Sequence, residues 1–175
     1  MGEVEIRSEV CRALLLHWRD VAEGAAGAPR RSDFDPLGMP RALIPHVFLN
    51  EIISDPFAVK ILVQGAFIRD GAKQAFTGRY IDRETFGDTW RGVVDIYRRV
   101  HAERRPLLSR ERHSSSDDRS LVVEVLHLPL FSQDGSVCAV LGGLDRAAEA
   151  PAGQGLSERA HRWEVLDVGP PAIRV

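Results

Sequence analysis

The sequence predicts an α+β fold in which a five-stranded antiparallel sheet follows a leading helix and carries a helical crossover on one face. Two observations support this prediction. Five short segments are rich in β-branched and other apolar residues and are bounded by turn residues, which is typical of strands, and one of them, FAVKILVQ, shows the alternation of a strand with one buried face. Apolar residues recur with helical spacing before the first segment and again between the second and third. A chain of 175 residues suits one buried core, so we expect a helix and linker over 1–30, the main domain over 31–145 and a tail over 146–175.

The leading helix is predicted by apolar residues at spacings of four, four and three, namely Val10, Leu14, Trp18 and Val21, with Leu15 beside them. A glycine-rich segment ends this pattern. Three prolines then leave room for no more than a short helical turn before the first strand, because proline restricts its own backbone and that of the preceding residue: Pro36, Pro40 and Pro45.

A hairpin and a helical crossover are expected next. HVFLNEII begins at His46, and FAVKILVQ follows Ser54-Asp55-Pro56, so these two runs predict a hairpin with one buried face. Helical spacing follows over Ile68–His101. Its clearest part is an apolar stripe, and either Asp82 or Thr85 can cap its start; the stripe comprises Phe86, Trp90, Val93, Val94, Tyr97 and Val100.

Three further strands are predicted over Leu107–His113, Leu121–Phe131 and Val137–Leu144, with turn residues between them. Gly142 and Gly143 lie inside the last strand, where glycine permits a close approach to the backbone. The tail ends in a stretch too apolar for disorder, and we expect it to dock on the sheet or on a second subunit; its apolar residues are Leu156, Trp163, Val165, Leu166 and Val168.

Four separated motifs resemble a group of short stand-alone bacterial PAS proteins, over about Leu14 to Asp145. The first combines Asp33-Phe34-Asp35-Pro36-Leu37 and Pro40 with the run Leu43 to Leu49; the others are Gly65, Phe76-Thr77-Gly78-Arg79, and the ending Leu128-Pro129-Leu130, Asp134-Gly135, Leu141-Gly142-Gly143-Leu144. Where this group usually has threonine after the glycine, this chain has Ala66. The resemblance implies a PAS-like sensor or interaction domain. PAS domains bind haem, flavin, small acids or nothing, so it implies no particular cofactor.

A ligand would lie between the crossover and the sheet. Candidate pocket residues carry aromatic, basic or titratable side chains: Phe67, Arg79, Tyr80, Trp90, Tyr97, His113, Glu124 and His127. Two alternatives stay open for several of them. Arg79 could bind a ligand carboxylate or phosphate with Tyr80 stacked beside it, or it could hold the crossover in place by bonding backbone carbonyls or a carboxylate of the protein. Trp90 and Tyr97 suit a packed core as well as a pocket.

Catalytic and metal sites are not expected. The sequence has no G-x-S-x-G nucleophile motif, its six histidines are all separate, and Cys11 and Cys138 are far apart. Glu111 and Glu124 could oppose each other across adjacent strands, but no complete catalytic set accompanies them. The absence of a cysteine between Cys11 and Cys138 excludes the covalent flavin photochemistry of light-sensing PAS domains.

Partner classes follow from charge and hydropathy. Basic residues are scattered and the net charge is -2, so we expect no nucleic-acid partner. With no apolar stretch long enough for a signal peptide or a membrane span, we expect a cytoplasmic protein.

The predicted function is therefore a non-enzymatic sensory or interaction module that acts through a signalling protein partner. An unidentified small molecule would occupy its cavity. The alternatives are a ligand-free structural interaction domain and a small enzyme on the same scaffold, for which His113, Glu124 and His127 would have to converge in one cleft. We also expect a homodimer through the apolar stripe of the leading helix, on the expectation that one small sheet leaves this stripe partly uncovered.

Overall fold

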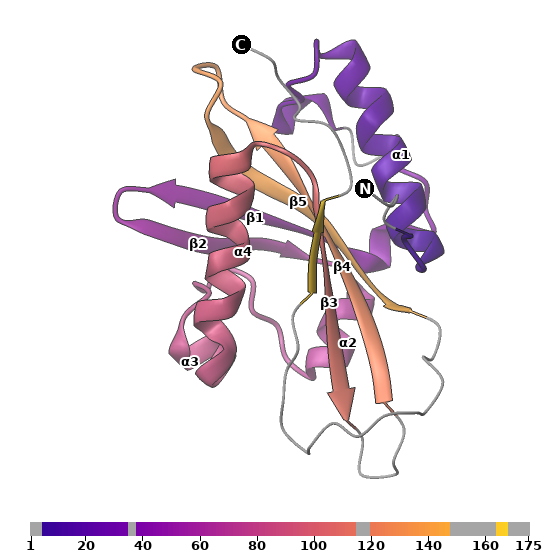
Figure 1. Ribbon diagram of the computed structural model, residues 1–175, viewed down its shortest axis with the longest axis vertical. Helices are drawn as coiled ribbons and strands as arrows, with labels where there is room; N and C mark the ends of the chain where they lie inside the picture. Colours follow the sequence, from indigo (N-terminus) through magenta and orange to yellow (C-terminus); the bar gives the residue numbers. More distant parts are fainter. Residues whose placement is uncertain (1–4, 35–37, 115–119, 148–163, 168–175) are drawn as a thin grey trace.

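The computed structural model describes residues 5–34, 38–114, 120–147 and 164–167 (Figure 1). The helices are α1 (Glu9–Gly24), α2 (Ala66–Ala72), α3 (Arg83–Phe86) and α4 (Trp90–Glu103), with short 3-10 turns η1 (Arg31–Asp33), η2 (Ile44–His46) and η3 (Gly87–Thr89). The strands are β1 (Val47–Ser54), β2 (Phe57–Gln64), β3 (Leu107–Ser114), β4 (Ser120–Phe131), β5 (Val137–Ala147) and β6 (Glu164–Asp167).

The strands form one antiparallel sheet in the order β2-β1-β5-β4-β3-β6. The predicted α+β class, the five strands, the crossover and the leading helix are confirmed. The structure adds β6, which pairs with β3 at the edge of the sheet (Figure 1). Of the two docking sites expected for the final apolar stretch, the sheet is therefore the one used by Val165 and Leu166. Leu156, Trp163 and Val168 lie outside the described residues, and the division of the chain at residues 31 and 146 stays a prediction.

The sheet separates two hydrophobic clusters, one under α4 and one under α1 (Figure 1). Strand alternation explains the separation, because consecutive side chains point to opposite faces. Val125 belongs to the cluster that contains Tyr97 of α4, and the next residue, Leu126, belongs to the cluster that contains Leu14 of α1. A residue's parity along β4 therefore decides which helix it contacts.

Helix α1 packs on the second face of the sheet and buries the middle of its apolar stripe there. Ser8 caps its first turn by accepting a hydrogen bond from the Cys11 amide at 3.1 Å. Leu14, Leu15 and Trp18 are all buried, and the Trp18 indole donates to the Pro129 carbonyl at 3.1 Å. Val10 and Val21, at the two ends of the same stripe, are only partly buried. The homodimer through this helix stays a prediction.

The glycine pair in β5 lets a side chain approach the strand backbone closely on each face of the sheet. A Cβ at Gly142 would overlap the Phe48 ring on the α4 face, and a Cβ at Gly143 would lie 2.7 Å from Leu14 Cδ2 on the α1 face. The predicted close approach at this pair is confirmed.

The predicted cap at Asp82 is confirmed for the short helix α3, which η3 separates from α4, and the predicted short turn before the first strand is present. The Asp82 carboxylate caps α3 by accepting from the Thr85 amide at 2.9 Å. Between the prolines and the first strand, only the 3-10 turn Ile44–His46 forms.

Candidate functional site

A small polar cluster lies inside the otherwise apolar layer between α4 and the sheet. It consists of Tyr97 from α4, Asn50 from β1, Ser109 from β3 and His127 from β4. All four side chains are buried, none more than 5% exposed. Polar groups in such a layer lose their bonds to water, so their partners decide what the cluster can do.

Asn50 and Tyr97 form the first half of the cluster. The Asn50 amide nitrogen donates to the Tyr97 hydroxyl at 2.5 Å. The Asn50 Oδ1 atom is buried and has no hydrogen-bond partner among the described residues. This oxygen can accept a hydrogen bond from a further donor.

His127 forms the second half. Its Nε2 lies 3.1 Å from the Ser109 hydroxyl, while its buried Nδ1 has no partner within the described part of the chain. The rings of Phe48 and Tyr97 meet it edge-on, with centroids 6.0 and 5.5 Å away. Whichever nitrogen carries the proton, one polar atom of this ring is left open.

The cluster is uncharged near neutral pH. Burial lowers the pKa of His127 to about 3, so the imidazole stays neutral. Burial also raises the pKa of Tyr97 above its ordinary value, and the hydrogen bond from Asn50 offsets this only in part. A charged group would enter this layer without a counter-charge from the four cluster residues, so the cluster suits a small uncharged molecule that can hydrogen-bond.

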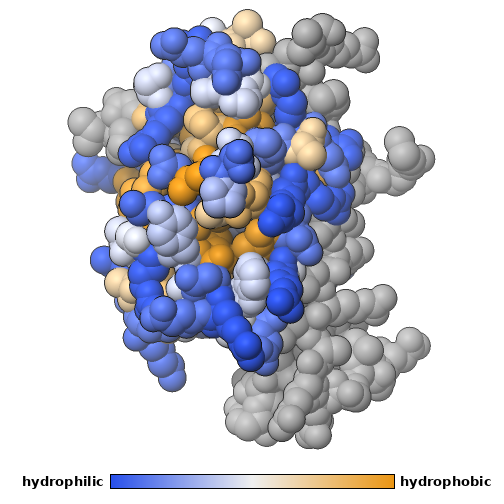
Figure 2. Space-filling model, turned by 90° about the vertical axis from the view of Figure 1, so that its left-hand side faces the viewer, coloured by the Kyte–Doolittle hydropathy of each residue, from blue (hydrophilic) through white to orange (hydrophobic). Residues whose placement is uncertain are grey.

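Three of the predicted pocket residues meet at this layer. Tyr97 and His127 contact each other directly, and the partly buried Trp90, at the start of α4, packs against the hydrophobic cluster that contains Tyr97. The face that carries the β1–β2 hairpin shows apolar residues gathered in its middle and bordered by hydrophilic ones (Figure 2). The partly buried apolar side chains that pack against this core are Ala28, Phe57, Ile68, Phe86, Trp90 and Leu144.

Phe67 lies elsewhere. It sits in α2 and stacks on His46, with ring centroids 4.3 Å apart, while the Arg146 guanidinium lies 5.8 Å from its ring centroid. His46 in turn contacts the Leu144 carbonyl at 3.2 Å. Phe67 therefore packs α2 against the start of the hairpin.

Arg79 and Tyr80 line the edge of the sheet. Gly78 has a φ of 85°, and the segment around Tyr80 bridges to Lys60, which covers the outer edge of β2. The Arg79 guanidinium bonds the Glu84 carboxylate at 2.6 Å, and Tyr80 is 43% exposed. Of the two readings of Arg79, the contact with a carboxylate of the protein is the one present.

Glu124 lies on the opposite face from His127, because the two residues are three positions apart on one strand. They do not converge in a cleft. The predicted opposition of Glu111 and Glu124 is wrong as well: Glu124 pairs with Arg110, and Glu111 with Val123. His113 pairs with Leu121 through its backbone, and its side chain lies outside the described residues.

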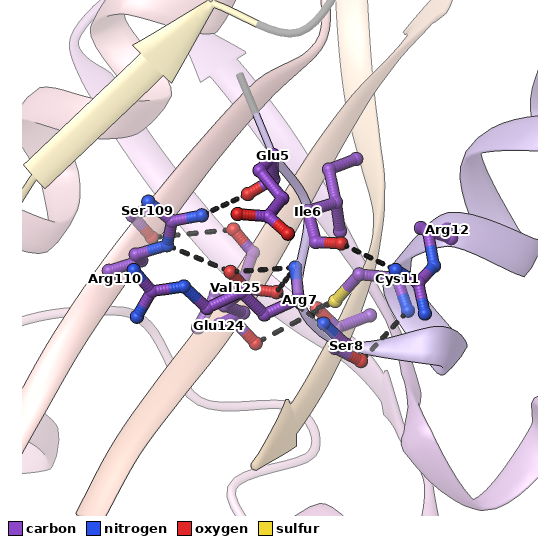
Figure 3. Close-up of polar contacts among 11 residues, drawn as sticks. Glu5, Ile6, Arg7, Ser8, Cys11, Arg12, Ser109, Arg110, Glu124 and Val125 are labelled. Carbon is purple, nitrogen blue, oxygen red and sulfur yellow. Dashed lines mark hydrogen bonds and ion pairs between the residues drawn. The ribbon is translucent and has the colours of Figure 1, made fainter. Parts of the chain in front are cut away.

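Glu124 instead anchors the segment that precedes α1 (Figure 3). Its carboxylate is fully buried and accepts hydrogen bonds from the backbone amides of Arg7 (3.0 Å) and Ser8 (2.7 Å) and from Arg110 Nε (2.8 Å). A second Arg110 nitrogen donates to the Glu5 carbonyl. We call this set of contacts the Glu124 clasp.

Sequence reasoning missed Asn50 and Ser109. Each interrupts an apolar alternation, with Asn50 between Phe48 and Ile52 and Ser109 two residues after Leu107. A polar residue at a position whose period assigns it to the core is the signal that could have found both.

Within the described ranges, no group of three or more His, Cys, Asp or Glu side chains could hold a metal ion. None of the described helices is long and apolar enough to cross a membrane.

Comparison with known proteins was made by family, by curated relatives and by structure. A family model described as "PAS domain" matches residues 6–145, a range that includes α1 and most of the Glu124 clasp. No curated protein matches the chain. Among solved structures, the PAS domain from Bordetella pertussis BvgS is similar at 20% identity, over 62% of this chain and 84% of that chain, with a TM-score of 0.46.

Proposed function

Because this chain belongs to the PAS domain family, we propose that it is a sensory module that signals through contact with another protein, and that its ligand site is the polar cluster under α4. PAS domains are generally non-enzymatic sensory and interaction modules. The single observation that supports the sensory role is the pair of open hydrogen-bonding atoms, Asn50 Oδ1 and His127 Nδ1, inside an apolar layer. Such atoms are costly to bury unless something satisfies them.

The proposed ligand is small and uncharged. Large side chains line the layer between α4 and the sheet, which favours a compact molecule; the buried aromatic ones are Phe48, Phe76, Tyr97 and Phe131. The neutral state of His127 and Tyr97 disfavours an ionic one. Occupancy would change affinity for the protein partner only if the ligand binds one conformation of α4 more tightly than another.

A direct test uses acetamide and acetate, two probes of equal size that differ in charge. Thermal unfolding and NMR chemical shifts of the full chain would be followed as each is added. We expect acetamide to stabilise the protein and to shift signals of Tyr97 and His127, and acetate to do neither. Asn50→Leu should abolish the response, and Ile52→Val, on the same face of β1, should preserve it.

The alternative function is a ligand-free interaction domain. The observation that favours it is the same packing: a core filled by aromatic side chains needs no ligand to be stable. Native mass spectrometry of the purified protein, together with the probe titrations, separates the two. If native mass spectrometry detects no bound ligand and acetamide causes no response, the ligand-free interaction domain is the function that remains. The predicted cytoplasmic location is tested separately by cell fractionation.

A further inference from the structure

Arg110 contacts two parts of the chain that are far apart in sequence. Its guanidinium bonds the Glu124 carboxylate and the Glu5 carbonyl, and so helps to hold the segment before α1. Its backbone pairs with Glu164 of β6 on the other edge of β3. One residue of β3 therefore touches both the leading segment and the last described strand.

The leading segment depends on the Glu124 clasp. Two of its backbone amides, those of Arg7 and Ser8, donate to the same carboxylate. Ser8 also caps α1 and donates through its hydroxyl to Asp145 at 2.8 Å. Loosening Glu124 would thus loosen the start of α1.

The clasp in turn depends on where Arg110 is held. A guanidinium forms several hydrogen bonds only within a narrow geometry, because its donors are fixed in one plane. Pairing with β6 makes β3 an internal strand over Leu107–Arg110. Without β6 this stretch would be an edge, and backbone at a sheet edge opens more readily than backbone paired on both sides.

We propose that Arg110 couples the two segments, so that β6 stabilises the Glu124 clasp and the clasp stabilises β6. Coupling of this kind is reciprocal by thermodynamic linkage. A partner or flanking segment that displaces β6 releases the residues before α1. A signal then passes from the β3 edge of the sheet to α1 without any change in the polar cluster of Asn50, Tyr97, Ser109 and His127.

The forward test replaces Val165, which pairs with Ser109, by proline in the full chain. Proline lacks the backbone donor and disfavours the strand. Val165→Thr is the matched control, because threonine keeps the strand propensity. Amide hydrogen exchange at Arg7 and Ser8 should be at least about fivefold faster in V165P than in V165T, with the β1–β2 ladder unchanged. Equal exchange at Arg7 and Ser8 in the two variants would overturn the coupling.

The reverse test perturbs the clasp and reads β6. Glu124→Gln should speed amide exchange over Glu164–Asp167, and Tyr97→Phe, on the opposite face, should not. If E124Q does not fold, the same exchange is measured in Arg110→Lys, because lysine keeps the charge and loses the planar set of donors. Exchange over Glu164–Asp167 should again be faster. Unchanged exchange in β6 in the variant that folds would contradict reciprocity.

Discussion

Arg110 and Glu124 lie opposite each other on β3 and β4, with Arg110 Nε 2.8 Å from a Glu124 carboxylate that is completely buried. Removing a carboxylate from water is costly, and here three donors compensate for it: the Arg110 guanidinium and the backbone amides of Arg7 and Ser8. The ion pair therefore joins the leading segment to the sheet. From the sequence, Glu111 rather than Arg110 was expected opposite Glu124.

The first prediction concerns this ion pair. Glu124→Gln should lower the free energy of unfolding by about 3–5 kcal/mol, because it removes the buried carboxylate charge that the largely buried Arg110 contacts. Glu84→Gln, which breaks the exposed pair with Arg79, is the matched control and should have little effect. Urea denaturation measures both, and similar losses in the two variants would refute the assigned importance of burial.

The second prediction concerns pH. The pKa of His127 falls from an ordinary value of 6.5 to about 3 in the folded protein. Between these values the unfolded chain binds a proton that the folded chain does not, so His127 lowers stability as the pH falls through 6.5. Between pH 7 and pH 5, the wild-type protein should lose about 2 kcal/mol more than His127→Phe. Parallel stability curves in urea titrations would show that His127 is not buried in its neutral form.

The third prediction concerns the glycine pair. Gly142→Ala should destabilise the protein by about 1–3 kcal/mol or more, because the added methyl group overlaps the Phe48 ring. Phe48→Leu in the same chain should recover part of the loss. Gly71→Ala is the control: its Cβ would meet open space on α2, and alanine favours helix. Thermal unfolding of the single and double variants provides the measurement, and additive losses would contradict a clash between these two residues.

The fourth prediction concerns the polar cluster. Tyr97→Phe should cost about 1–3 kcal/mol, because it leaves the buried Asn50 amide without its acceptor. The double variant with Asn50→Leu should be more stable than Tyr97→Phe alone, since both polar partners are then gone. A double-mutant cycle in urea tests this pair, and a coupling energy near zero would mean that the hydrogen bond does not contribute to stability.

Much of the fold could be predicted because it depends on local backbone geometry. Residues at alternate positions of a strand share a face, so Phe48 and Val59 could be assigned to a buried face from their spacing alone. The Asp82 cap and the glycine pair in β5 were predictable for the same reason, since each concerns a residue and its near neighbours.

The candidate site was predicted only in part. Tyr97 and His127 were expected and do meet, but Glu124, Arg79 and Phe67 serve other contacts. Each of those three has the chemistry of a ligand-binding residue, and chemistry alone does not tell which face of the sheet or which edge a side chain reaches. For Glu124 the parity with His127 already pointed to the opposite face.

The sequence by itself determined the order of the elements, the class of the fold and the apolar stripes, because strand and helix periods are properties of consecutive residues. Only the tertiary structure decided that β6 joins the edge of the sheet, that α1 is covered by the sheet, and that Arg110 rather than Glu111 faces Glu124. These relationships join residues up to 137 positions apart, as between Ser8 and Asp145, and depend on strand register. A shift of one residue in register would replace every pair across the two strands, and no local pattern encodes that choice.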